Sequence, residues 1–354
     1  MKRDLPIHDP LLAQALAAES ALAQAHEARR QGELALALAH ALAAHAQAPL
    51  AGLKAAAGLL ACFCHFRLGQ HGALLGLGEP LLGLVVEPAR RLELLRWLTV
   101  AAAETGHYPV AQRLGAEALN LAEQVGDEAA HTAVRQAVAL GFDRMGDPWR
   151  AEQLMCEALP QAESQPVLYP LLSTLQLLTE ATIDEYHLMP HRPRPAEPTA
   201  DPTLARAQAY ARRARAAAQR IGDEHFRGFL DGLLGEVLLL QGQVDEAWPM
   251  LERALCQAQA HGHATLAARM DCSLAEGLLR RHEPQQAIAR LQTLLADGGE
   301  HLPPTLRQRA HRAMVRACQA VGQQERAAMH LAQADRLQRA LASWRSPLPA
   351  PVLP

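Results

Sequence analysis

Apolar residues recur along the chain at the three- and four-residue spacing of amphipathic helices, and short turns that carry glycine separate the helical runs. The clearest example is the stretch LLGEVLLLQGQVDEAWPMLERAL, residues 233–255. With its turn residue Gly242 counted as position 15, small residues stand at positions 8, 20 and 27, and large aliphatic residues at 7, 11 and 24. Small residues let two helix axes approach closely and large ones fill the remaining space. The pattern predicts a pair of antiparallel helices.

The same phrase returns throughout the chain. Its turns stand at Gly32, Gly69, Gly106, Gly146, Gly242 and Gly322, with His282 in the equivalent place of one unit. The spacings are 37, 37, 40, 96, 40 and 40 residues, and the long one fits two units of 40 separated by an insertion of 16. One pair of helices cannot bury its apolar stripe alone, so the units must stack. The sequence therefore predicts an all-α solenoid of about eight antiparallel helix pairs.

The residues at these positions resemble the tetratricopeptide repeat (TPR), for example Gly106, Tyr108, Ala111 and Ala118 at positions 15, 17, 20 and 27. The period near 40 makes the chain similar to the long-repeat regions of bacterial signalling regulators of the MalT-like type. The resemblance implies a right-handed superhelix whose first helices line a concave groove. We expect an N-terminal segment at 1–11, the solenoid at 12–343 with an exposed proline-rich insertion of polyproline type at 187–202, and a disordered proline-rich tail at 344–354.

Composition narrows the classes of function. The 354 residues include 34 basic and 37 acidic side chains and only 4% aromatic residues, so the chain lacks the charge and the stacking platforms of nucleic-acid-binding proteins. The N-terminus has no apolar leader region, and no apolar run is long enough to cross a membrane. We expect a cytoplasmic protein that binds neither nucleic acid nor a membrane, with its six scattered cysteines reduced.

No sequence motif points to catalysis. The chain lacks a phosphate-binding glycine loop, the GxSxG of hydrolases and the HExxH of metalloproteases. Three small clusters, residues 62–65, His187 with His191, and His261 with His263, do not supply the four ligands of a metal site. We therefore expect no enzyme activity, no cofactor and no bound metal.

In the family that the chain resembles, positions 2, 5, 9 and 12 of each first helix point into the groove. Applied to this sequence, that spacing gives as candidate partner-binding residues Arg96, Gln136, Asp143, Phe229, Glu236, Arg269, Glu276, Arg309, Arg312 and Arg316. The last three lie on one helical stripe, where like charges repel unless an anion is near. This stripe is either a clamp for an acidic peptide or a C-terminal carboxylate, or the solvated face of a final helix. Phe63 and Phe66 either form an apolar anchor in the groove or pack in the core.

The resulting prediction is a non-catalytic interaction module that holds a segment of a partner protein in its concave groove, in bacterial signalling or regulation. The alternative is a ligand- or peptide-sensing solenoid that acts in trans on a separate output protein. Whether the chain forms a homodimer stays open.

Overall fold

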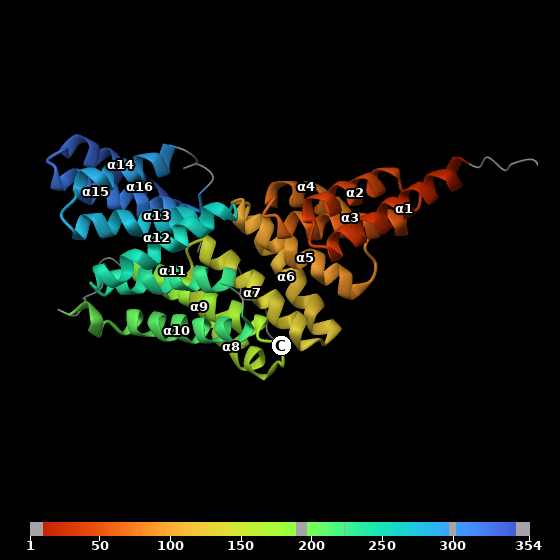
Figure 1. The fold of residues 1–354 in the computed structure, drawn as a ribbon, viewed down its shortest axis with the longest axis horizontal. Helices are drawn as coiled ribbons and strands as arrows, with labels where there is room; N and C mark the ends of the chain where they lie inside the picture. Colours follow the sequence, from red (N-terminus) through yellow and green to blue (C-terminus); the bar gives the residue numbers. More distant parts are fainter. Residues whose placement is uncertain (1–9, 189–196, 223, 297–301, 345–354) are drawn as a thin grey trace, which may run out of the picture. The chain divides into compact units, whose positions relative to one another are not determined.

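The computed structural model describes residues 10–188, 197–222, 224–296 and 302–344. Over this part of the chain it contains sixteen α-helices and one short 3-10 turn, and no strand. The helices follow one another as eight antiparallel pairs (Figure 1). The predicted all-α solenoid of about eight helix pairs is therefore confirmed.

The chain divides into two compact units, and the first is Met1–Ala137. Each of the first five helices packs against the next, and the first helices of its three successive pairs also contact one another. The helices of this unit are α1 (Pro10–Arg30), α2 (Leu34–Gln47), α3 (Ala51–Arg67), α4 (His71–Leu81), α5 (Pro88–Glu104), α6 (Tyr108–Val125) and the first part of α7 (Glu128–Arg144).

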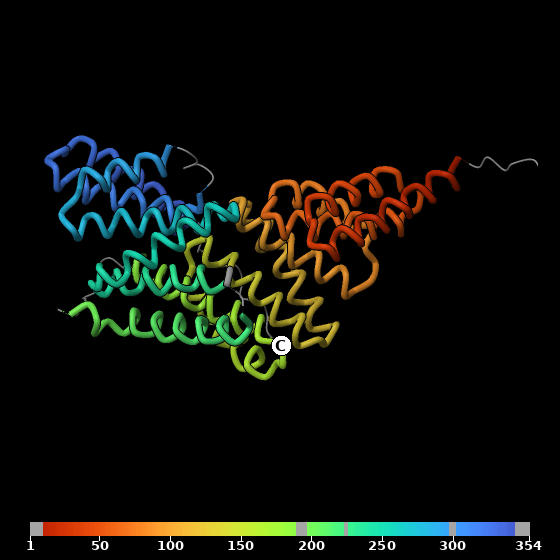
Figure 2. The backbone as a smooth tube through the Cα atoms, viewed as in Figure 1, coloured from red at the N-terminus to blue at the C-terminus, as the bar shows by residue number. Residues whose placement is uncertain are grey.

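The second unit is Val138–Pro354. It contains the end of α7 and α8 (Pro148–Ser164), α9 (Tyr169–Leu188), α10 (Pro202–Ile221), α11 (Glu224–Leu240), α12 (Val244–Ala260), α13 (Ala264–Arg280), α14 (Pro284–Ala296), α15 (Pro304–Ala320) and α16 (Gln324–Trp344). Figure 2 lets the reader follow the chain back and forth through these pairs. The first helices α9, α11, α13 and α15 contact one another in succession, so one face of the unit is built from first helices alone.

The turns between paired helices have the left-handed backbone conformation that glycine adopts without strain. Gly242 has a φ of 92°, and the next residue donates its backbone N–H to the carbonyl of Leu238 at 2.9 Å, which closes the helix end. His282 takes the same conformation, with a φ of 61°, in the one unit that lacks glycine there. The turn spacing that predicted the repeat therefore follows from a backbone requirement.

Small residues let adjacent helices touch. A Cβ atom added to Gly232 of α11 would lie 2.6 Å from the Cβ of Ala254 and 2.8 Å from the sulfur of Met270. Such a distance is shorter than van der Waals contact, so only glycine fits at this approach of α11 to α12 and α13. Leucine and alanine fill the rest of the core, as the sequence pattern predicts.

In the structure, the segment between α9 and α10 is shorter than the insertion predicted at 187–202. His187 and Leu188 continue α9, and Asp201 caps α10 by accepting a hydrogen bond from the backbone N–H of Thr203 at 2.8 Å. Pro202 begins that helix, a position where proline needs no hydrogen-bond partner. The polyproline prediction refers mainly to residues 189–196, which lie outside the described residues, as do 1–9 and the tail from 345 onward. The domain boundaries given above remain a prediction.

None of the described helices has the length and hydropathy that crossing a membrane requires.

Candidate functional site

The first helices of the second unit carry charged side chains into its interior. Glu180 and Asp184 lie on α9, Glu236 on α11, Glu276 on α13 and Arg309 on α15, and each is at most 9% exposed. Charged side chains are almost never buried to this degree unless they are paired. We call the following residues the ion network: Asp143, Arg144, Glu180, Asp184, His187, Glu236, Arg269, Glu276, Arg309 and Arg316.

Glu236 is the centre of the network. Its Oε2 accepts a hydrogen bond from Arg269 Nε at 2.7 Å, and its Oε1 pairs with Arg309 Nη1. Arg309 also donates from Nε to Glu276 Oε1 at 3.0 Å and from Nη2 to Ser273 Oγ at 3.0 Å. The planar guanidinium of Arg309 therefore ties α15 to both α13 and α11.

The guanidiniums keep the central carboxylates ionised. Burial alone would raise the pKa of each glutamate, but Arg269 and Arg309 hold the pKa of Glu236 far below its ordinary value, and Arg309 is the main cause that lowers the pKa of Glu276 to about 2. Burial, followed by the charge of Arg309, lowers the pKa of His187. Its imidazole is thus neutral at neutral pH, with Nε2 at 3.7 Å from Glu236 Oε1.

The other end of the network holds an excess of acid. Arg269 Nη2 lies 2.9 Å from Asp184 Oδ1, and Arg144 contacts Asp143 Oδ2 at 2.8 Å and Glu180 Oε2 at 3.5 Å. Burial and the neighbouring Asp184 raise the pKa of Asp143 to about 8, so its carboxyl group is largely protonated at neutral pH. The second oxygen of Asp143, Oδ1, is buried without a hydrogen-bond partner.

Counting charges shows why one carboxyl stays protonated. In the described part of the chain, the network sets five buried carboxyl groups against the three buried guanidiniums of Arg144, Arg269 and Arg309. Arg316 lies 3.5 Å from Glu276 Oε1, but its side chain is 57% exposed. Water screens that fourth charge, so the interior keeps more acid than it can pair.

Six of the ten residues predicted from the sequence belong to the ion network: Asp143, Glu236, Arg269, Glu276 and Arg309 in its buried part, and Arg316 at its exposed edge. Their pairing follows the repeat. In two successive units, the arginine at position 2 (Arg269, then Arg309) bonds the glutamate at position 9 of the unit before, 33 residues upstream. Side chains at the positions that the resemblance places in the groove therefore pair with one another across successive repeats.

The three arginines of the α15 stripe have different surroundings. For Arg309, an anion is supplied by the chain's own Glu236 and Glu276. Arg312 donates to Gln338 Oε1 of α16 at 2.6 Å, and Arg316 extends from the network edge. Only Arg316 of the three is largely exposed, so the stripe is not a uniform anion clamp.

Three further candidates lie elsewhere. Phe229 is partly buried and packs against hydrophobic clusters on both sides of α11, which makes it a core contact. Gln136 is partly buried on α7, and Arg96 lies in the first unit, on α5.

The sequence analysis missed Arg144, Glu180, Asp184 and His187. The last three stand at a spacing of four and three residues on α9, which places them on one stripe of that helix. That spacing was available in the sequence. The insertion after α9 removes the turn glycine from which positions were counted, so the register of this unit could not be assigned.

The first unit has a separate cluster of aromatic and basic residues on α1, α3 and α5. The Phe63 and Phe66 rings lie 5.9 Å and 6.1 Å from the ring of Trp97. Arg96 stands over Phe66 and Trp97, with its Cζ atom 5.7 Å and 5.9 Å from the two ring centroids. Both phenylalanines pack on Trp97 and are only partly buried.

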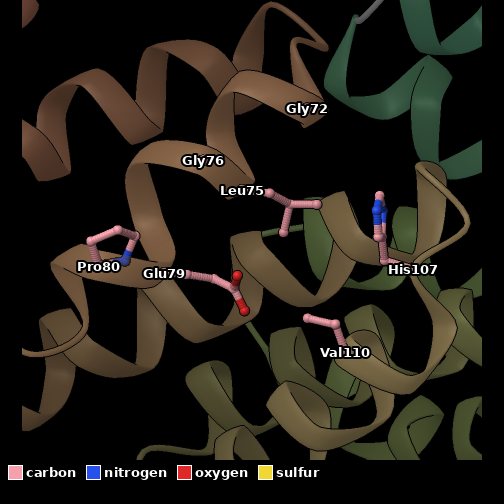
Figure 3. Close-up of a pocket in the computed structure, with 7 residues that line it drawn as sticks. All are labelled: Gly72, Leu75, Gly76, Glu79, Pro80, His107 and Val110. Carbon is pink, nitrogen blue, oxygen red and sulfur yellow. The ribbon is translucent and has the colours of Figure 1, made fainter.

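Figure 3 shows a depression on the outer helices of the first unit, between α4 and α6. Its lining consists of Gly72, Leu75, Gly76, Glu79, Pro80, His107 and Val110. Leu75 and Val110 lie between Glu79 and His107 in this view, and Glu79 is paired with Arg113 at 2.8 Å. The polar groups do not converge, so the depression offers no arrangement for chemistry.

No three His, Cys, Asp or Glu side chains come together as metal ligands would among the described residues. Burial raises the pKa of the Cys62 and Cys272 thiols to about 12, so neither is a reactive thiolate at neutral pH.

No family model matches the chain, and no curated protein sequence matches it. Solved structures do. A Rap protein complexed with competence and sporulation factor has a TM-score of 0.63 at 10% identity, over 95% of this chain and 100% of the other. The Rap conjugation gene regulator of plasmid pLS20, in complex with the Phr* peptide, has a TM-score of 0.58 at 16% identity, over 82% of this chain and 75% of the other.

A third similar structure is aspartyl phosphate phosphatase F from Bacillus subtilis, with a TM-score of 0.55 at 11% identity over 82% of this chain and 72% of the other. At these identities the likeness concerns the fold alone. The chain has the fold of TPR-like helical repeat proteins, and the predicted resemblance is confirmed at that level.

Proposed function

We propose that this protein is a non-catalytic regulator that binds a segment of a partner protein on the face formed by its first helices. The observation that carries the proposal is the ion network. Five buried carboxyl groups lie on one face of successive repeats, where stacking alone would need only apolar residues. Two of the similar structures contain a bound factor or peptide, which supports a recognition role for this fold.

The energetics of the network favour a binding role over a purely structural one. Burying ion pairs gives little net stability, and apolar residues of similar volume often stabilise a fold more. The excess acid and the unpaired Oδ1 of Asp143 add to that cost. A network that is costly and incompletely satisfied has polar groups left to exchange with the polar groups of an entering segment.

The alternative function, a sensor that acts in trans on an output protein, rests on the connectivity of the same residues. Arg309 and Arg269 link four first helices, α9, α11, α13 and α15, through side-chain bonds. A ligand that replaced one of these bonds would change how neighbouring repeats pack. Under this alternative, hydrogen exchange in α11 to α15 should change when ligand binds.

We propose no catalytic activity, although one protein of similar fold bears the name of a phosphatase. Ser273 Oγ donates to the backbone carbonyl of Arg269, and burial raises the pKa of the Cys272 thiol to about 12, so neither is an activated nucleophile. Four statements remain predictions from the sequence: a cytoplasmic location, no binding of nucleic acid, no binding of a membrane, and a possible homodimer.

Selection of linear peptides from a displayed library against the full chain tests the proposal. We expect a selected peptide to raise the melting temperature of the protein in proportion to its concentration. Asp184→Asn removes one charge from the ion network. It should lower the affinity for that peptide by about tenfold, since hydrogen bonds to charged groups contribute about 1.5–3 kcal/mol.

The matched control is Glu252→Gln, an exposed acid on the outer helix α12, which should bind the peptide like the wild type. Circular dichroism of both variants checks that they fold. Failure to enrich any peptide, or equal binding by Asp184→Asn and the wild type, would contradict the proposal.

A further inference from the structure

Three arginines of the first unit stack on aromatic rings. The Cζ atoms of Arg29 and Arg67 lie 5.5 Å and 6.0 Å from the centroid of the Phe63 ring. Arg96 stacks on Phe66 and Trp97, as described above. The three arginines come from α1, α3 and α5, the three successive first helices of this unit, so they lie along one face of the repeat.

Among the described residues, these three arginines differ from four others of the unit, each of which forms an ion pair with a glutamate. Arg30, Arg90, Arg91 and Arg113 each lie within ion-pair distance of a glutamate. Within the described residues, Arg29, Arg67 and Arg96 have no ion pair with a carboxylate, and Glu93 acts on Arg96 only through space. The aromatic rings hold the guanidiniums in place without neutralising their charge.

Stacking fixes how the guanidiniums can bind. A guanidinium that lies on a ring uses its flat face for that contact and keeps its N–H edge free to donate to a carboxylate or phosphate. Burial lowers the pKa of Arg96, which shows that its charge is kept at a cost. An anion at these edges would relieve that cost and the repulsion among like charges.

We propose that Arg29, Arg67 and Arg96, held by the rings of Phe63, Phe66 and Trp97, form a receptor for an acidic segment of a partner protein. The arginines are distributed over three helices, an arrangement that fits several carboxylates along an extended chain better than one compact anion. Phe63 and Phe66 are only partly buried, so this aromatic surface suits an apolar side chain next to the acids. The inference rests on the proposed function and assigns a partner chemistry to the first unit.

Fluorescence anisotropy with the full chain tests this inference. The probe is a labelled peptide built of Glu-Leu-Glu triplets, and its Gln-Leu-Gln counterpart is the uncharged control. We expect the acidic peptide to bind the wild type. The triple variant Arg29→Gln/Arg67→Gln/Arg96→Gln should bind that peptide with an affinity at least about tenfold lower. The interaction should also weaken as salt concentration rises, because part of the surface is exposed.

The control variant Arg30→Gln/Arg90→Gln removes two exposed arginines of the same unit that already have glutamate partners, and it should bind like the wild type. Arg96→Gln alone keeps the inference testable if the triple variant fails to fold. Equal binding of the acidic and uncharged peptides would overturn the inference that this surface is a receptor for acidic segments. Equal binding by the arginine variants and the control variant would overturn it too.

Competition by inorganic phosphate at the peptide's own concentration would overturn the choice of an acidic segment and indicate a small anion. If the wild type binds anionic vesicles but no acidic peptide, and the arginine variants abolish the vesicle binding, the partner is a membrane surface and not an acidic segment. These results do not decide the proposed function, because that function is tested separately with Asp184→Asn in the second unit. A selected peptide that depends on Asp184 while acidic peptides fail to bind would reject only this inference.

Discussion

At the scale of single residues, Asp143 decides how the second unit responds to pH. Its pKa in the folded protein is raised to about 8 against an ordinary value of 3.8, so the folded state binds a proton that the unfolded state releases between these values. Stability from this group is therefore greatest at low pH and falls as pH rises from about 4 to about 8. Asn in its place resembles the protonated carboxyl and cannot ionise.

We expect Asp143→Asn to stabilise the protein by about 1–3 kcal/mol above pH 8 and to have a smaller effect near pH 4. Urea unfolding of both proteins across this range measures the difference. The readout is the gap between the two stability curves, which cancels every other titrating group. A gap that stays constant with pH would show that Asp143 is ionised in the folded state.

At the scale of helices, two glycines of α4 test whether small residues are needed where helices pack closely. A Cβ at Gly76 would meet nothing within 4 Å, whereas a Cβ at Gly78 would lie 2.7 Å from Leu98 Cδ2, on a fully buried side chain. Alanine has the higher helix propensity, by about 1 kcal/mol. Gly76→Ala should therefore stabilise the first unit by about 0.5–1 kcal/mol.

Gly78→Ala should destabilise the same unit by about 1–3 kcal/mol, because the clash with Leu98 exceeds the gain in propensity. Chemical unfolding of the two variants gives the sign of each change. The two sites are two residues apart on one helix, so each is the control for the other. Stabilisation by both substitutions would mean that α4 and α5 are packed less tightly than we describe.

Elements and turns were predictable from the sequence because each follows from a local rule. The turn at Gly242 needs a left-handed backbone, and Ala247 and Ala254 need to be small for their helices to touch. The ion network could be predicted only in part. Arg269 and Arg309 at position 2, with Glu236 and Glu276 at position 9, form a pattern visible in the sequence, but their pairing requires the way in which successive repeats stack.

The contact between Arg309 and Glu236 spans 73 residues and two repeats, and no local rule predicts it. The contribution of α9 was hidden by the insertion that follows it. The aromatic cluster was suspected from Phe63 and Phe66, yet Trp97 and the three stacked arginines come from helices whose mutual rotation the pattern does not specify.

At the scale of the whole molecule, the two units carry their charges differently, which predicts that acid affects them unequally. In the second unit, Glu276 has a pKa lowered to about 2, and that of Glu236 is lowered further. The stability they give is complete above about pH 4.5 and is lost as pH falls toward 2. Protonation of His187 adds a loss below about pH 6.5, since burial lowers its pKa. The opposite contribution of Asp143 is complete near pH 4.

The ion pairs of the first unit are exposed, as for Arg30 with Glu27 and Arg113 with Glu79, or half-exposed, as for Arg91 with Glu117, and they contribute little at any pH. We therefore expect the second unit to open first when the protein is acidified below about pH 4. Hydrogen exchange followed by mass spectrometry separates the units, because fragments from α11 to α15 and from α3 to α5 can be read independently. Loss of protection in α11 to α15 at a higher pH than in α3 to α5 would agree with a network that stabilises the second unit only while its carboxylates are ionised. Simultaneous loss in both sets of helices would mean that the ion network does not set the acid limit.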